Sequence, residues 1–369
     1  MFLLRALRIS INALFAPSLP LSTRLYLLLL QPISLLTYTI EWLRARRFPH
    51  SHEIRIPLKR VPGHTVRALV YLPSPQPPSP QETGTGKAIL RPLHLNIHGG
   101  AFLGGLPEGN ARFCRQLAQE AGAVVVSTTY RYAPVHTFPD AHEDVQDVAE
   151  YLVHHAVELF NADPACFTVS GFSAGGNLAL GISQGCMNMD VAVRGSVVFY
   201  GVVDFRIPPW DKPIPKGFPE KDPLSFLQPL FDTYAGPNRA RDISNPLLHP
   251  TLADIRTLPQ NMLFIVGEKD ILHDETVTMT ERLQYEAERV NLENGVVERS
   301  RGSWSEERDT GKCPDGKKVV VRTEVFAGQI HGWLEMPSAA IDVKTRTKAF
   351  GDAIGFLRGI HRAYGFNKE

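Results

Sequence analysis

A serine stands between two glycines in the motif GFSAG at residues 171–175. A β-like run at 167–170 precedes the motif, and a helix-like run at 177–183 follows it. A serine on so tight a strand-to-helix turn points outward at the start of the helix, and side chains at the glycine positions would clash with neighbouring elements. The motif therefore predicts that Ser173 is a nucleophile that attacks a carbonyl carbon.

A serine hydroxyl attacks a carbonyl only when a base removes its proton, so Ser173 needs a histidine and an acid that orients it. Asp270 directly follows a β-like run at 262–266, and His331 follows another at 318–326. The chain order of serine, acid and histidine is the one expected for a nucleophile on such a turn. Because functional groups gather at the carboxyl ends of parallel strands, we expect the three side chains to meet there.

A glycine-rich motif, HGGAF at residues 98–102, comes directly after another β-like run. A tetrahedral intermediate needs hydrogen-bond donors already aimed at its oxyanion, and each donor contributes roughly 10²- to 10³-fold in rate. A glycine-rich backbone can turn its N–H groups toward such a site. We expect the amides of Gly100 and Ala101 to form an oxyanion hole, with Gly99 making the turn and Ala174 adding a further amide.

The elements around these motifs alternate between strand and helix. In the predicted helix at 141–155, apolar residues recur at spacings of three and four, which places one apolar stripe against a sheet. Such alternation predicts an α/β fold with a mostly parallel central sheet flanked by helices. The strands are predicted at 53–56, 66–71, 93–97, 124–128, 167–170, 197–200, 262–266 and 318–326, and the helices at 108–121, 141–155, 175–186, 275–290 and 338–359.

Three irregular stretches interrupt this alternation. Residues 73–87 are rich in proline and glycine and predict a solvated hairpin loop, whereas the polar stretch at 291–316 predicts a surface excursion. Residues 205–245 are rich in proline and aromatics and predict an inserted lid. The expected organisation is an N-terminal segment, residues 1–50, followed by one catalytic domain, residues 51–369.

Composition excludes several classes of protein. Hydrophobic residues make up 43% and charged residues 21% of the 369 residues, as is usual for a globular protein with a sizeable core. The 39 basic residues nearly balance the 38 acidic ones, so the chain lacks the positive field that nucleic-acid binding needs. The four cysteines are scattered and suggest neither a disulfide framework nor a zinc site. We expect no metal or cofactor and a reducing, cytoplasmic location, with membrane association left open.

The N-terminal segment permits three interpretations. The apolar run at 25–43 has nearly the length of a membrane span, but Gln31, Pro32 and Glu41 interrupt it. Six arginines precede residue 50 and Glu41 is the one acid there, which also suits a helix at a membrane surface. We favour lid helices first, a membrane-surface anchor second and a cleaved signal third.

Taken together, these motifs resemble the hormone-sensitive lipase family of α/β-hydrolases, which comprises esterases and lipases. The resemblance covers residues 93–333. The matching blocks are IHGGAF at 97–102, YRYAPVHTFPDAHEDV at 130–145, GFSAGGNLAL at 171–180, GEKDILHDE at 267–275 and IHGW at 330–333.

The resemblance implies an α/β-hydrolase fold whose lid is built from the N-terminal segment and the insertion. It also implies hydrolysis of small-molecule carboxylic esters through an acyl-enzyme, without metal or cofactor. The chain departs from the family pattern at Phe172 and Thr129, where many members have aspartate. The separation of Asp270 and His331, 61 residues, is also longer than the family usually shows.

Two other functions are compatible with the same motifs. Some relatives of the family are small-molecule receptors that keep the pocket and lose the catalytic histidine, but His331 is present here. A peripheral membrane protein that acts through its apolar N-terminus is the other alternative. The sequence leaves the natural substrate, the acyl length, the alcohol moiety and the oligomeric state open.

Overall fold

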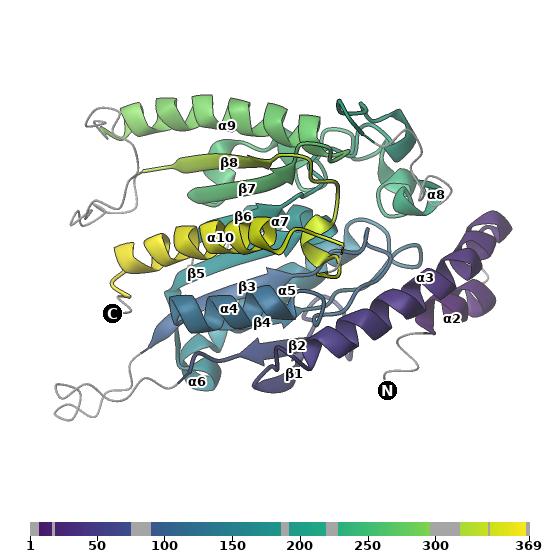
Figure 1. The fold of residues 1–369 in the computed structure, drawn as a ribbon, viewed down its shortest axis with the longest axis horizontal. Coiled ribbons are helices and arrows are strands. Elements are labelled where there is room, and N and C mark those ends of the chain that lie inside the picture. The colour runs from purple at the N-terminus through teal and green to yellow at the C-terminus, as the bar shows by residue number, and fades with distance from the viewer. Residues whose placement is uncertain are drawn as a thin grey trace.

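An eight-stranded sheet forms the centre of the molecule (Figure 1). The computed structural model describes residues 7–16, 19–74, 90–185, 192–218, 228–295, 318–338 and 340–366. The strand order is β1-β2-β4-β3-β5-β6-β7-β8, and only the β1/β2 and β2/β4 pairs are antiparallel. The strands are β1 (His52–Pro57), β2 (Thr65–Tyr71), β3 (Arg91–Ile97), β4 (Val124–Thr128), β5 (Ala162–Phe172), β6 (Val193–Phe199), β7 (Asn261–Gly267) and β8 (Val320–Phe326).

Helices cover both faces of the sheet (Figure 1). The helices α4 and α10 lie on one face, and α5, α7 and α9 lie on the other. The helices are α2 (Arg8–Phe15), α3 (Leu21–Ala45), α4 (Ala111–Ala121), α5 (Asp140–His154), α6 (Ala156–Phe160), α7 (Ala174–Gly185), α8 (Gln228–Phe231), α9 (His273–Glu293) and α10 (Val343–Ala363). Short 3-10 helices lie at Pro209–Asp211, Gly236–Asn238, Pro250–Leu252, Ile255–Thr257 and Trp333–Glu335.

The strand β7 shows why this sequence forms a sheet that is buried on both faces. Successive side chains of a strand point to opposite faces. Leu263 and Ile265 accordingly pack into the cluster beneath α10, whereas Met262 and Phe264 pack into the cluster beneath α9. All four are buried, so a continuous apolar run replaces the alternation of a half-exposed strand.

The predicted α/β-hydrolase fold is confirmed, and two local predictions are wrong. The segment at 73–87 was expected to close a hairpin, but β2 pairs with β1 and β4 while β3 pairs with β4 and β5. Residues 75–87 of that segment lie outside the described residues. The last helix begins at Val343 rather than at residue 338, because the Asp342 side chain caps it by accepting hydrogen bonds from the amides of Lys344 and Thr345.

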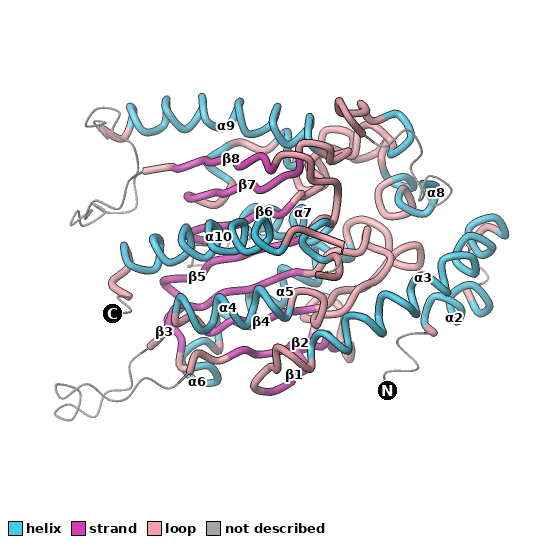
Figure 2. Tube along the Cα trace, viewed as in Figure 1, coloured by secondary structure: helices cyan, strands magenta, loops and turns pink. Residues whose placement is uncertain are grey.

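The two helices α2 and α3 form an N-terminal hairpin beyond the carboxyl ends of the parallel strands, where loops also gather (Figures 1 and 2). The Ser10 amide and hydroxyl donate to Gln31 Oε1 at 2.9 and 2.8 Å, which ties the two helices together. The helix α3 also contacts α8, which belongs to the proline-rich insertion. Within the described residues, none of the helices combines the length and apolarity that a bilayer crossing requires.

Candidate active site

Ser173 lies on a sharp turn between β5 and α7, with a left-handed φ of 51°. Its amide donates to Phe199 O at 2.9 Å, which fixes the turn against β6. A Cβ atom at Gly171 would lie 1.9 Å from Gly175 O, and one at Gly175 would lie 2.2 Å from Ile97 O. Backbone therefore packs directly on backbone, and only glycine fits at these two positions.

The structure brings Ser173, Asp270 and His331 together from the ends of three strands. Ser173 Oγ lies 2.9 Å from His331 Nε2, and His331 Nδ1 lies 3.0 Å from both carboxylate oxygens of Asp270. Asp270 is fully buried and also accepts a hydrogen bond from the Leu272 amide at 2.8 Å. Because the carboxylate only accepts, Nδ1 carries the proton and Nε2 is left to accept the proton of the serine hydroxyl.

The electrostatic surroundings favour a protonated His331. Partial burial lowers the pKa of the imidazole, but the charge and the hydrogen bond of Asp270, with help from Glu335 and Glu275, outweigh it and raise the pKa above its ordinary value. A raised pKa makes His331 a stronger base and stabilises the imidazolium that forms when it takes a proton. The geometry and the raised pKa would therefore allow His331 to take the proton of the Ser173 hydroxyl.

The glycine-rich loop (residues 98–105) lies beside Ser173. A Cβ atom at Gly99 would lie 3.3 Å from Ser173 Cβ. Gly100, Ala101 and Phe102 all have left-handed φ angles, of 111°, 52° and 61°. Among the described residues, the amides of Gly100 and Ala101 donate to no backbone or side-chain acceptor. These donors are therefore available to an external acceptor next to Ser173.

Residues of the 130–145 block support this loop from the core. His98 is buried, donates from Nδ1 to Gly99 O at 2.7 Å and stacks on Tyr130 at a ring separation of 4.8 Å. Burial lowers the pKa of His98 to about 4, so its ring is neutral. The Tyr132 hydroxyl lies 3.1 Å from His98 Nε2 and donates to Gly105 O at 2.9 Å. The block thus fixes both ends of the loop.

Tyr200 is a neighbour of His331 that sequence reasoning missed. It follows β6, is fully buried, and presents its ring edge-on to His331 with the ring centroids 5.2 Å apart. Its hydroxyl donates to Glu335 at 3.3 Å, and Glu335 also accepts from Asn110 at 3.2 Å. The signal in the sequence was the position of Tyr200 at the carboxyl end of the strand predicted at 197–200, the sheet edge at which Asp270 was also expected.

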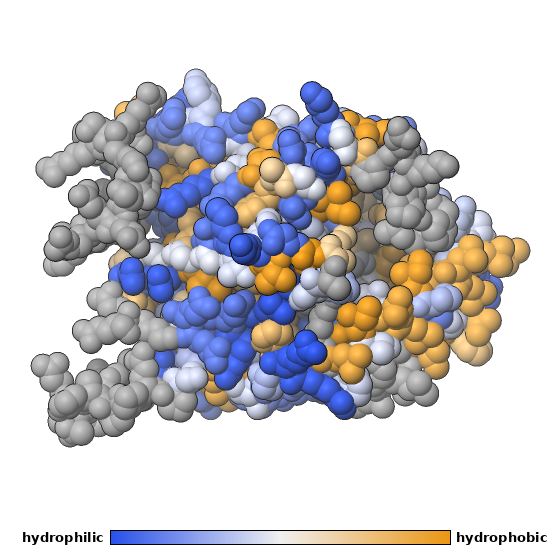
Figure 3. All heavy atoms as spheres, viewed as in Figure 1, coloured by the Kyte–Doolittle hydropathy of each residue, from blue (hydrophilic) through white to orange (hydrophobic). Residues whose placement is uncertain are grey.

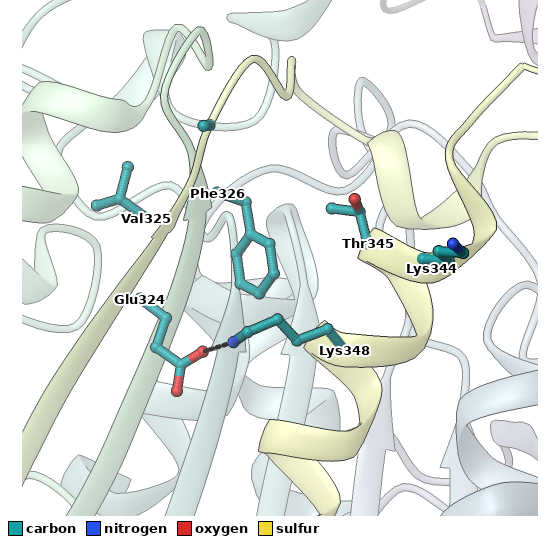
Figure 4. Close-up of a pocket in the computed structure, with 7 residues that line it drawn as sticks. Glu324, Val325, Phe326, Lys344, Thr345 and Lys348 are labelled. Carbon is teal, nitrogen blue, oxygen red and sulfur yellow. Dashed lines mark ion pairs between the residues drawn. The ribbon is translucent and has the colours of Figure 1, made fainter.

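A pocket of about 610 Å³ lies apart from these residues, between β8 and α10 (Figure 4). Lys348 crosses it, 5.1 Å above the Phe326 ring and 3.7 Å from Glu324. None of its lining residues is a predicted site residue; they are Glu324, Val325, Phe326, Ala327, Lys344, Thr345 and Lys348. Within the described part of the chain, no three His, Cys, Asp or Glu side chains are grouped to hold a metal ion.

Comparisons with known proteins agree with the fold and with the motifs. Residues 94–296, more than half of the chain, match the family described as alpha/beta hydrolase fold. The chain belongs to this family, and its esterase and deacetylase relatives confirm the predicted likeness to the hormone-sensitive lipase type.

Two curated relatives and one solved structure illustrate the likeness. An ethyl acetate hydrolase of Pseudomonas putida is 29% identical, over 62% of this chain and 69% of its own. An esterase of Mycobacterium tuberculosis, LipI, is 28% identical over 52% of this chain and 59% of its own, so the match spans about three fifths of that relative. The thermostable carboxylesterase EstE1 from a metagenomic library is 26% identical and superposes with a TM-score of 0.64, over 87% of this chain and 94% of its own.

Proposed function

We propose that this protein is a serine hydrolase that cleaves carboxylic esters of small molecules. Ser173 is the nucleophile, His331 the base and Asp270 the acid that orients it. The observation that supports this most is the continuous set of contacts from Ser173 Oγ through His331 to the buried Asp270 carboxylate. The esterase names of the relatives support the substrate class.

The reaction proceeds in two halves. Ser173 Oγ attacks the ester carbonyl carbon while its proton passes to His331 Nε2, and the negative charge develops on the carbonyl oxygen. The amides of Gly100, Ala101 and Ala174 donate to this oxyanion. Collapse of the intermediate breaks the ester bond, and His331 gives its proton to the departing alcohol. Water then attacks the acyl-enzyme with His331 again acting as base, which releases the carboxylic acid and restores Ser173.

A series of p-nitrophenyl esters of increasing acyl length tests the proposal and defines the acyl preference. We expect hydrolysis of a short or medium acyl ester, and Ser173→Ala should lower turnover on the order of 10⁶-fold. Ser183→Ala, on the helix that follows the nucleophile, is the matched control and should behave like the wild type. Undiminished turnover by Ser173→Ala would overturn the assignment of the nucleophile, whereas a wild type that binds these esters without hydrolysing any of them would favour a receptor function on the same fold.

We further propose that the N-terminal hairpin and the insertion at 205–245 form a lid over the site. The contact between α3 and α8 supports this, because it joins the two segments on the side of the sheet where Ser173 lies. Lys212 of the insertion lies 2.8 Å from Asp204 O and pairs with Glu275 of α9, close to the acid loop. A lid that excludes water strengthens the electrostatic stabilisation of the oxyanion.

The outer face of the N-terminal hairpin supports contact with a membrane surface. Apolar side chains gather over α2 and α3 (Figure 3). Residues 7–50 also contain five arginines and one glutamate, a charge balance that complements anionic lipid headgroups. We propose that this face lies on an anionic bilayer without crossing it. The apolar residues that are more than half exposed there are Leu14, Phe15, Leu21, Leu25, Leu29, Leu36 and Leu43.

Sedimentation with lipid vesicles tests the membrane contact. The wild type should sediment with phosphatidylcholine vesicles that contain phosphatidylserine, and less with vesicles that lack it. The double substitution Leu25→Glu/Leu29→Glu should abolish sedimentation, whereas Leu292→Glu, at an even more exposed leucine on α9, should not. If the double variant sediments like the wild type, the hairpin is not the membrane contact.

A further inference from the structure

The glycine-rich loop holds the amides of Gly100 and Ala101 in a backbone conformation that needs support from neighbouring residues. Gly100, Ala101 and Phe102 are consecutive left-handed residues, and two of them carry a Cβ atom. Non-glycine residues rarely adopt this region, and they keep it only where surrounding contacts impose it. The residues that impose it on this loop therefore control where the oxyanion amides point.

Two side chains of the N-terminal hairpin reach the backbone of this loop. Arg8 of α2 donates to Leu103 O at 2.5 Å, and its guanidinium lies 3.8 Å above the centroid of the Tyr132 ring. Tyr38 of α3 is buried, and its hydroxyl accepts a hydrogen bond from the Gly105 amide at 3.1 Å. Each helix of the hairpin thus contributes one polar contact to the loop.

These contacts lie on the same turn as the oxyanion amides. The Leu103 amide donates to Gly100 O at 2.9 Å, which closes a turn over residues 100–103. Arg8 binds the carbonyl at the Leu103 end of this turn, and the oxyanion amides lie at the Gly100 end. The approach is also close, because a Cβ atom at Gly104 would lie 2.6 Å from the Tyr38 hydroxyl and 3.4 Å from Arg8 Nη2. Tyr132, stacked beneath Arg8, holds the Gly105 carbonyl from the core side.

We infer that the N-terminal hairpin positions the oxyanion hole, with Arg8 and Tyr38 as positioning residues. The inference rests on the proposed ester hydrolysis and adds a role that a lid does not require: the hairpin acts on the electrostatics of the reacting carbonyl as well as on access to it. A misplacement of about 1 Å in a reacting group costs up to 10²-fold in rate. Loss of either contact should therefore lower kcat without weakening substrate binding.

Replacement of the ester carbonyl oxygen by sulfur provides a readout specific to the oxyanion hole. A thiono ester develops its charge on sulfur, which is a weaker hydrogen-bond acceptor, so it benefits less from the amides of Gly100 and Ala101. The ratio of kcat for an oxo ester to kcat for the matching thiono ester measures how well the amides are aimed. A change in general stability or in substrate access affects both substrates alike.

The experiment compares Tyr38→Phe and Arg8→Met with Arg24→Ala in the full chain. Tyr38→Phe removes one acceptor and keeps the ring, and Arg8→Met keeps an apolar stem. Arg24 is the matched control, because it also donates to backbone carbonyls, those of Ala13 and Leu14, but these lie within the hairpin itself. Thermal denaturation of each variant verifies that it is folded.

We expect kcat for the oxo ester to fall about tenfold or more in Tyr38→Phe and Arg8→Met, with KM within about twofold of the wild type and a matching fall in the oxo-to-thiono ratio. Arg24→Ala should keep the wild-type ratio. An unchanged ratio in both variants would overturn the positioning role and leave the hydrolase standing. If Ser173→Ala keeps full activity instead, the proposed hydrolase is wrong and the positioning role falls with it.

Discussion

The nucleophile turn and the glycine-rich loop both hold backbone in left-handed conformations beside the same reaction centre, yet they are held in different ways. The turn at Ser173 is fixed by backbone packed on backbone, where Gly171 and Gly175 leave no room for a side chain. The loop is fixed partly by Arg8 and Tyr38, which belong to a separate N-terminal segment. The position of Ser173 is thus set by the packing of the sheet, whereas the proposed oxyanion donors depend on residues about 65 to 95 positions earlier in the sequence.

The largest expected loss of kcat comes from replacing His331, the proposed base that contacts Ser173. His331→Ala should lower kcat on the order of 10⁶-fold, nearly as much as loss of Ser173, because the members of a triad act as one unit. His273→Ala is the matched control: His273 lies close after Asp270 but is paired with Asp274 on α9. Steady-state kinetics should give a far lower kcat for His331→Ala than for His273→Ala. A lower kcat for His273→Ala would identify His273 as the base.

Asp270→Asn should lower kcat on the order of 10⁴-fold, because the amide can stabilise the wrong tautomer of His331. The pH profile adds a second readout. His331 must be neutral to accept a proton, so activity is lost as pH falls through its pKa, and Asp270 raises that pKa. Removal of the negative charge should therefore move the acidic limb of kcat/KM to lower pH. A limb that stays in place would show that His331 is not the titrating group.

A pair of glycine substitutions tests the comparison directly. Gly175→Ala forces a Cβ atom against Ile97 O, at 2.2 Å, and should reduce the free energy of unfolding by more than about 4 kcal/mol or prevent folding. Gly104→Ala meets the Tyr38 hydroxyl instead, a side-chain end that can move, and should cost only about 1 to 3 kcal/mol while lowering kcat. Urea denaturation and kinetics measure both. Equal losses of stability would mean that the two regions are held alike.

The smallest expected effect on the pH profile comes from Glu335, whose carboxylate accepts the hydrogen bond of Tyr200. Glu335 contributes to the raised pKa of His331, after Asp270. Glu335→Gln should therefore move the acidic limb in the same direction as Asp270→Asn but less far, with kcat within about threefold of the wild type because Glu335 acts on the base only through its charge. If kcat fell further in Glu335→Gln than in Asp270→Asn, Glu335 rather than Asp270 would be the carboxylate that orients His331.

The sequence predicted the fold and the convergence of Ser173, Asp270 and His331 because both depend on local patterns. Apolar runs mark the buried strands, and residues directly after parallel strands meet at one edge of the sheet. The partners of the strand at 65–71 could not be predicted in this way, because pairing with β1 and β4 is decided by the whole sheet. The start of α10 was missed because the capping role of Asp342 overrides the apolar pattern before it.

The contacts of Arg8 and Tyr38 had no signal in the sequence. Arg8 was counted among the six N-terminal arginines as a basic residue that suits a membrane surface, yet its side chain points to a backbone carbonyl of the glycine-rich loop. Nothing in the local pattern distinguishes it from Arg24, which bonds within the hairpin. Only the packing of the hairpin against the sheet edge separates the two, and that packing is a property of the tertiary structure.

A pair of hydrogen bonds at the far end of β8 shows how His331 keeps its position although it lies 61 positions after Asp270 in the sequence. The Asn291 side chain both donates to Val319 O at 2.9 Å and accepts from the Val319 amide at 2.7 Å, so the end of α9 is tied to the start of β8. His331 follows the opposite end of β8. The start of β8 is thereby held by α9 itself, so the position of His331 beyond the other end of the strand does not depend on the length of chain that separates the two tied residues.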